Sequence, residues 1–216
     1  MLSVSEAEGR AGALIEAARK AGADAADVLY IGDAATEVQV RLGELEDVTR
    51  SEGEEIGLRL FVGRRSASVS SSDLSTDALS ALVDRAVAMA REAPEDPYAG
   101  LAPEDRLFKG APPYLAADDN ADPTPVELKE RALATEEAAR AVAGITNSEG
   151  AGMSAGRTVI ALATSHGFCR GYSTSGYGAY ASVIGGEGGG MQRDSASHST
   201  RFYADLDAPE APITLA

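Results

Sequence analysis

Residues 56–71 read IGLRLFVGRRSASVSS, and this stretch sets the fold class. Apolar side chains occupy every second position from Ile56 to Val62, and the alternation resumes at Ala67 after a turn at 63–65. A period of two is typical of a strand with one buried side and one solvent-facing side, and a tight turn joins two such strands side by side. The stretch therefore predicts neighbouring strands of an antiparallel meander.

The sequence before and after this pair extends the pattern. Strands are expected at 27–31 and 37–42, where apolar and polar residues also alternate. Helices are expected at 5–21 and 76–93, because small and apolar residues recur there every three or four positions. The first unit, 1–93, is therefore predicted as a helix, four strands and a second helix.

A proline-rich segment follows this unit. Seven of the nine prolines lie between Pro94 and Pro125, and apolar periodicity is weak there. Such a composition is typical of a linker or a long ordered loop. We therefore expect residues 94–124 to connect the first unit to a second one, 125–216.

The second unit opens with a well-marked helix. Thr124 is placed as the N-cap, Pro125 as the first helical residue and Glu127 as the partner in a capping box. The helix should end near Ala143, and short strands separated by glycine and serine turns are expected at 158–163, 168–173, 177–184 and 192–203. The predicted fold class is α+β, with helices packed on largely antiparallel sheets in two helix-plus-meander units.

Charge and composition exclude several classes of protein. Asp and Glu number 34 against 19 Lys and Arg, which gives a formal net charge of −15. Duplex DNA binding draws much of its affinity from Lys and Arg contacts to phosphates, so direct nucleic-acid binding is not expected.

The sequence shows no signal peptide and no apolar run long enough to span a membrane. One cysteine forms no intrachain disulfide, and we expect a soluble, cytoplasmic protein.

Potential zinc ligands are few. His166 and Cys169 stand three positions apart, and His198 follows in a separate predicted strand. A structural zinc site usually needs four protein ligands and a catalytic site three. We therefore predict no metal site in this sequence.

An acidic segment imitates the start of a calcium-binding loop. Asp118, Asn120 and Asp122 follow the D-x-N-x-D pattern, but Pro123 and Lys129 replace the Gly and Glu that such a loop requires at its sixth and twelfth positions. A solvated acidic turn is the favoured interpretation. The carboxylate pairs Glu54-Glu55 and Glu136-Glu137 are likewise expected to be solvated.

The glycine run at 185–190, GGEGGG, leaves two interpretations open. A phosphate-binding loop would require a following Lys-Ser/Thr and a helix, and neither is present. Glycines beside a strand permit either a bend with close approach of another backbone or a flexible hairpin tip. Serine nucleophile chemistry has little support, because no G-x-S-x-G elbow occurs and the serines around His198 alternate as in a strand.

Four stretches together resemble the N-terminal domain of the TldD/PmbA family, first called modulator of DNA gyrase. They are residues 25–75, 93–102, 146–168 and 188–207. Their most specific motifs are EDPYAGLA (95–102), NSEGA (147–151) and GGGMQRD (188–194). The first and last of these motifs are more similar to the PmbA (TldE) branch than to the TldD branch.

The resemblance implies a component of a cytoplasmic metalloprotease, in which TldD-like and PmbA-like subunits assemble and cleave unfolded or extended peptides. Family zinc is held by an HExxxH motif in the C-terminal half of TldD-type chains, and this sequence contains no such motif. The resemblance therefore implies zinc in the partner TldD-type subunit, no cofactor in this segment, and no catalytic or metal-binding residue here. It also implies that family members continue beyond this segment into a C-terminal half.

The hypothesis that follows is a non-catalytic scaffold and substrate-guiding domain. An exposed strand edge could pair backbone-to-backbone with an extended peptide. The expected peptide- or subunit-contacting residues are Gly188, Gly189, Gly190, Met191, Gln192, Arg193 and Asp194. For Arg193 and Asp194, a structural turn with an internal Arg–Asp pair is an open alternative. The expected partners are a TldD-like subunit, a second copy, or both; the alternative function is a stand-alone protein-binding or oligomerisation module.

Overall fold

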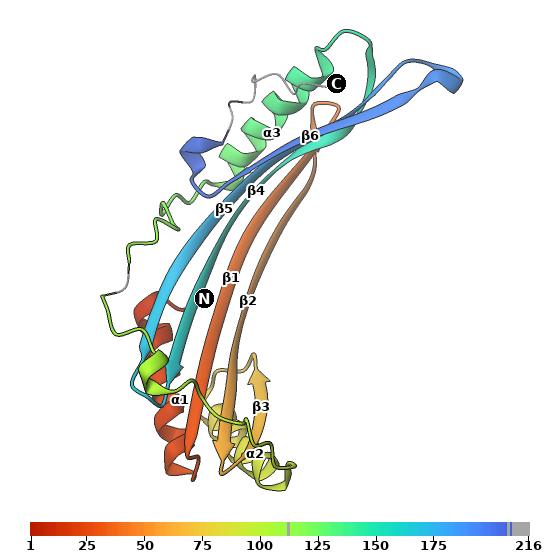
Figure 1. The fold of residues 1–216 in the computed structure, drawn as a ribbon. Helices are drawn as coiled ribbons and strands as arrows, with labels where there is room; N and C mark the ends of the chain where they lie inside the picture. The colour runs from red at the N-terminus through yellow and green to blue at the C-terminus, as the bar shows by residue number, and fades with distance from the viewer. Residues whose placement is uncertain (112, 207, 209–216) are drawn as a thin grey trace. The chain divides into compact units, whose positions relative to one another are not determined.

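The computed structural model describes residues 1–111, 113–206 and 208 (Figure 1). The helices and strands are α1 (Val4–Lys20), β1 (Ala25–Arg41), β2 (Glu44–Val62), β3 (Arg65–Ser71), α2 (Thr76–Glu92), α3 (Pro125–Arg140), β4 (Ile145–Thr164), β5 (Cys169–Gly185) and β6 (Gln192–Thr200). Short 3₁₀ helices are η1 (Glu104–Arg106), η2 (Gly188–Gly190) and η3 (Tyr203–Asp205). The predicted α+β class is confirmed. No helix in the described part of the chain is both long and apolar enough to cross a bilayer.

The strands form one six-stranded sheet in the order β3-β2-β1-β4-β5-β6. The sequence favoured two sheets, and the difference arises at β1 and β4, which lie next to each other in the centre of this order. The Ser165 amide, just after β4, donates to the Ala26 carbonyl of β1 over 2.8 Å, and Gly156 of β4 lies beside Ala35 of β1. The residue number rises along one strand as it falls along the other, so β1 and β4 are antiparallel.

The strands are longer than their periodicity indicated. The predicted strands at 27–31 and 37–42 merge into the single strand β1, so residues 1–93 contain three strands and not the four expected. β2 begins at Glu44, in a stretch where residues 44–53 are exposed on both sides and therefore show no alternation. Backbone pairing, which leaves no side-chain pattern, is what extends these strands.

Two compact units are each assembled from three chain segments. The first comprises 1–33, 52–115 and 158–173, and the second comprises 34–51, 116–157 and 174–216. Strands β1, β2, β4 and β5 contribute residues to both. The division of the chain into 1–93, 94–124 and 125–216 stays a prediction, and residues 207 and 209–216 of its last part lie outside the described residues.

The core of the first unit forms where α1 and α2 cover one side of the strands. Ser3 caps α1 in a capping box with Glu6, and Ser75 caps α2. The buried stripe of each helix meets alternate residues of β1, β2 and β4, such as Val28 and Leu58. Burial of these apolar stripes stabilises the helices more than their intrinsic propensity does.

The core of the second unit lies beneath α3. Thr124 and Glu127 form the predicted capping box, with Pro125 in the first turn. The helix ends at Arg140, three residues before the expected end at Ala143. Leu128 and Ala132 of α3 are fully buried in the apolar cluster that includes Val38 of β1. This packing fixes the position of the strands that carry the candidate site.

Candidate functional site

The predicted contact segment forms a turn and the start of an edge strand. β6 pairs antiparallel with β5 from Tyr177 opposite Thr200 to Gly185 opposite Gln192, and it is the last strand of the sheet that the described residues form (Figure 1). The residues between β5 and β6 form a turn in which the backbone approaches itself closely. Gly186 has a φ of +80°, and a Cβ atom there would lie 2.7 Å from the Gly190 carbonyl oxygen. The close backbone approach that one interpretation of the glycine run expected is therefore present at Gly186.

The strand register decides which groups of β6 face away from the sheet. In β5 the Ser175 amide bonds outward to the Ala117 carbonyl, and amides of alternate residues point the same way along a strand. Odd-numbered residues of β5 therefore point their amides at β6, and their partners are even-numbered. The outward-facing amides of β6 are those of Arg193, Ser195, Ser197 and Ser199.

The part of the β5 edge that β6 does not cover is occupied by other residues, unlike the edge of β6. Where β6 does not reach, the Gly171 amide of β5 donates to the Glu8 carboxylate over 2.7 Å. Ser175 is covered by Ala117 over 2.9 Å. Along β6, the Ser195 amide bonds to the side chain of Asp194 (2.8 Å), but in the described part of the chain no acceptor outside the β5–β6 pair meets the Ser197 or Ser199 amide. Within the described residues, β6 is therefore an open edge.

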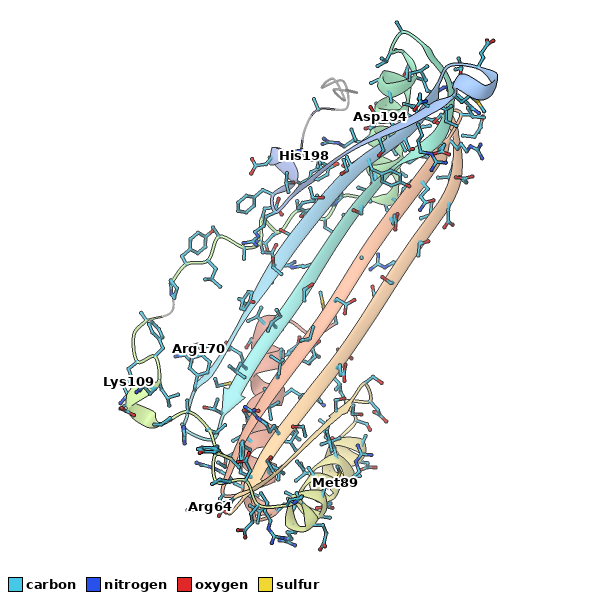
Figure 2. The ribbon with its side chains drawn as sticks, turned by 45° about the vertical axis from the view of Figure 1, so that its right-hand side comes forward. Arg64, Met89, Lys109, Arg170, Asp194 and His198 are labelled. Atoms are coloured by element: carbon cyan, nitrogen blue, oxygen red, sulfur yellow. The ribbon has the colours of Figure 1, made fainter. Side chains whose placement is uncertain are left out.

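Arg193 and Asp194 do not form the internal pair that was the alternative interpretation. The Arg193 guanidinium forms an ion pair with Glu149 of β4, whose other carboxylate oxygen accepts from the Ser182 hydroxyl of β5 over 2.9 Å. The side chain of Asp194 accepts from the next amide along the strand, and Figure 2 shows Asp194 on β6. The motifs NSEGA and GGGMQRD thus meet through Glu149 and Arg193.

Glu136 organises the base of this site, and the prediction that it is solvated was wrong. Its side chain is 1% exposed and accepts from the amides of Leu42 (2.7 Å) and Gly43 (2.8 Å) and from the Ser148 hydroxyl (2.5 Å). Burial raises the pKa of Glu136, but these three donors and the positive charge of Arg140 outweigh it and lower the pKa below its usual range. A buried carboxylate thus ties α3 to the β1–β2 turn and to the NSEGA motif.

The acidic segment at 118–122 is also not a simple solvated turn. The guanidinium of Arg157 on β4 lies 2.7 Å from a carboxylate oxygen of Asp118 and 2.7 Å from the side-chain oxygen of Asn120. Asp119 accepts from the Tyr177 hydroxyl (2.7 Å) and from the Tyr203 amide (2.6 Å). The segment therefore fastens the long connection to the second unit.

The electrostatics of this attachment favour a charged Asp119. Burial raises the pKa of Asp119, yet hydrogen bonds from Tyr177, Tyr203, Ala121 and Ser175 lower it below the usual range overall. Burial, followed by the hydrogen bond to Asp119, raises the pKa of Tyr177 to about 12. The phenol therefore stays protonated and continues to donate to the carboxylate at neutral pH.

The three potential zinc ligands considered in the sequence do not form one cluster. His166 follows β4 in a turn and Cys169 begins β5, both in the first unit. His198, labelled in Figure 2, lies opposite Ala179 in the second unit. No three His, Cys, Asp or Glu side chains among the described residues are grouped as a metal site would require. The described donor set therefore does not fit zinc, which needs at least three protein ligands.

The sequence matches a known family over most of its length. Residues 26–90 match PmbA/TldA metallopeptidase domain 1, and residues 118–216 match the PmbA/TldA metallopeptidase central domain. The chain is 34% identical over 188 residues to metalloprotease PmbA of Escherichia coli O157:H7, which covers 87% of this chain and 42% of that protein. The chain belongs to the PmbA/TldD metallopeptidase family. The resemblance drawn from the sequence motifs is confirmed.

A second PmbA relative agrees with this assignment. The PmbA homolog of Haemophilus influenzae is 33% identical over 199 residues, which covers 90% of this chain and 43% of that protein. The chain thus spans less than half the length of these two PmbA relatives.

Solved structures show that the PmbA/TldD fold is shared. A protein from Bacteroides thetaiotaomicron described as a modulator of DNA gyrase aligns with a TM-score of 0.83 at 24% identity, over 96% of this chain and 48% of that chain. TldE from Thermococcus kodakarensis aligns with a TM-score of 0.77 at 16% identity, over 92% of this chain and 44% of that chain. At these identities the similarity establishes the fold alone.

Proposed function

We propose that this chain is the non-catalytic scaffold and substrate-guiding part of a PmbA/TldE-type subunit in a zinc metalloprotease complex. A TldD-type partner supplies the zinc, and the outer edge of β6 pairs with an unfolded or extended peptide. In this proposal the chain supplies no zinc ligand, because the donor set among the described residues does not fit the metal. The observation that carries the proposal is the open edge of β6 beside the blocked edge of β5.

The chemistry of this edge suits a peptide without a fixed sequence. A strand that adds to a sheet edge is held by main-chain hydrogen bonds, which any non-proline residue supplies. β6 contains no proline and carries small serine side chains at three of its outward-facing positions, 195, 197 and 199. Folded proteins have few unpaired extended segments to offer such an edge. Selection for unfolded substrate therefore follows from the backbone geometry.

Arg193 has a secondary role in this proposal. Its ion pair with Glu149 is largely exposed on the arginine side, at 68%, and exposed ion pairs contribute little stability. The guanidinium is therefore available to exchange Glu149 for a carboxylate of the peptide or of the partner subunit. Asp194, by contrast, holds the Ser195 amide and shapes the start of the edge.

A proline substitution tests the edge directly. Ser197→Pro removes an outward-facing amide, and proline is tolerated on an edge strand where its nitrogen faces away from the sheet. We expect Ser197→Pro to abolish binding of a fluorescently labelled unfolded peptide, measured by anisotropy. Ser197→Ala removes the hydroxyl but keeps the amide, so it should bind as the parent chain does. Equal thermal unfolding midpoints would show that the strand is intact.

Two further outcomes bear on the proposal. Normal peptide binding and normal cleavage by the full-length protein with its TldD-type partner, both with Ser197→Pro in place, would overturn the role of the edge. In the same complex, unchanged assembly and cleavage after joint replacement of Arg193 and Asp194 by alanine would remove these two residues from the site. Failure of zinc-dependent cleavage with any partner would favour the stand-alone binding or oligomerisation module.

A further inference from the structure

A concave site lies in the first unit, between the long connection and the β4–β5 turn. Its volume is about 370 Å³. The lining residues are Leu107, Phe108, Lys109, Gly110, His166, Gly167, Phe168, Cys169 and Arg170. Figure 2 labels Lys109 on the connection and Arg170 at the start of β5, and both belong to this one cavity.

The charge of the cavity lining contrasts with that of the chain. Lys109, His166 and Arg170 line it, and no Asp or Glu does, although the chain carries a net charge of −15. Among the described side chains, neither Lys109 nor Arg170 has a carboxylate partner within ion-pair distance. The Arg170 guanidinium donates to the Cys169 carbonyl over 2.6 Å, which occupies one of its five N–H groups. The cavity therefore concentrates positive charge that the described carboxylates do not neutralise.

Much of the remaining lining is apolar. Phe108 and Phe168 contribute aromatic rings, and Leu107 adds an aliphatic side chain. A Cβ atom at Gly110 would lie 2.8 Å from the Phe108 ring, so the glycine lets this ring sit against the backbone. Phe108 is 62% exposed, which leaves much of its surface free to cover a bound apolar group.

Cys169 adds no negative charge to the cavity. Burial, followed by the nearby charge of Glu8, raises the pKa of the Cys169 thiol, and the thiol donates to the Glu8 carbonyl over 3.4 Å. The Glu8 carboxylate is itself bonded to the Gly171 amide and does not line the cavity. No thiolate or lining carboxylate therefore competes with an anionic ligand.

We propose that this cavity binds the carboxylate of an organic anion that also carries an apolar group. The planar guanidinium of Arg170 matches a carboxylate in two-point geometry, and Lys109 adds a compact positive charge. The volume lies at the lower end of the range for small-molecule sites. The C terminus of a peptide that ends in an apolar residue presents this chemistry; that last identification rests on the proposed function, whereas the carboxylate site does not.

Binding of N-acetyl-phenylalanine tests the site, with N-acetyl-phenylalanine amide as the uncharged probe. Isothermal titration should show the carboxylate binding at least about tenfold more tightly than the amide, because only the carboxylate engages both cations. Lys109→Met with Arg170→Met should weaken binding at least about tenfold. The control, Arg64→Met with Arg85→Met, removes the same charge from residues outside the cavity and should change affinity less than about twofold.

Several results would overturn the proposal. They are no binding of N-acetyl-phenylalanine, equal binding of its amide, or an equal loss in the control variant. Tighter binding of phenyl phosphate than of N-acetyl-phenylalanine would also overturn it and identify a phosphate site. Equal unfolding midpoints of the two double variants exclude misfolding as the cause. Ser197→Pro should leave binding of N-acetyl-phenylalanine unchanged. The proposal for the cavity and the proposal for the β6 edge can therefore fail independently of each other.

Discussion

At the scale of single residues, Glu136 is a buried carboxylate that joins three parts of the second unit. It is buried with three hydrogen-bond donors directed at it, from Leu42, Gly43 and Ser148. Glu136→Gln replaces one accepting oxygen with an NH₂ group that faces donors, so a buried donor loses its partner. We expect the free energy of unfolding at pH 7 to fall by about 1–3 kcal/mol, measured by urea denaturation.

The control for this change is the next residue, Glu137, which is exposed. Glu137→Gln should leave stability within about 0.5 kcal/mol of the parent. The pKa of Glu136 is lowered in the folded state, so its stabilisation is complete above the unfolded pKa of about 4.3 and is lost as pH falls through the lower folded pKa. The stability difference between parent and Glu136→Gln should therefore shrink only in that acidic range; a difference that is constant down to pH 2 would contradict this account.

At the scale of elements, two strand glycines are expected to respond differently to an added methyl group. Gly150 of β4 has a φ of +118°, and a Cβ atom there would lie 2.7 Å from the Val40 carbonyl oxygen of β1. Gly150→Ala would strain the backbone and push the two strands apart, with an expected loss of about 2 kcal/mol or more in the free energy of unfolding. Thermal and urea unfolding would measure it.

Gly176 of β5 provides the matched control. A Cβ atom at Gly176 would meet nothing within 4 Å, and its φ lies outside the left-handed region. Gly176→Ala should be neutral or stabilise by up to about 1 kcal/mol, because it restricts the unfolded chain. If both substitutions cost the same, close strand approach at Gly150 would not explain its role in the NSEGA motif.

At the scale of the whole molecule, the net charge of −15 should govern encounter with peptides. We expect the association rate of a lysine-rich unfolded peptide to fall at least about tenfold between low salt and physiological salt, measured by stopped-flow fluorescence. An uncharged peptide of equal length should change by less than about twofold. The same charge predicts no binding of duplex DNA at physiological salt in a mobility-shift assay. Salt-independent association of the lysine-rich peptide would contradict the steering argument.

The α+β class, the helix starts and the family could be recognised from local sequence. The alternation at 56–62 reflects a sheet with one buried side, and the capping box at Thr124 and Glu127 operates within one turn of chain. These signals are local, so periodicity and spacing reveal them without knowledge of the rest of the fold. The motifs NSEGA and GGGMQRD likewise identified the family by their order along the chain.

The contacts between distant segments required the tertiary structure. From the sequence, Glu136 was expected to be a surface carboxylate, but the β1–β2 turn packs against it. Asp119 was expected to lie in a solvated turn, but Tyr177 and Tyr203 donate hydrogen bonds to it. The extension of β2 through 44–53 left no side-chain pattern, because both of its sides are exposed. By itself the sequence determined the fold class, the helix caps and the family, since each rests on neighbouring residues. Only the tertiary structure decided which carboxylates are buried and which strand edge is open, because both depend on partners far away in the chain.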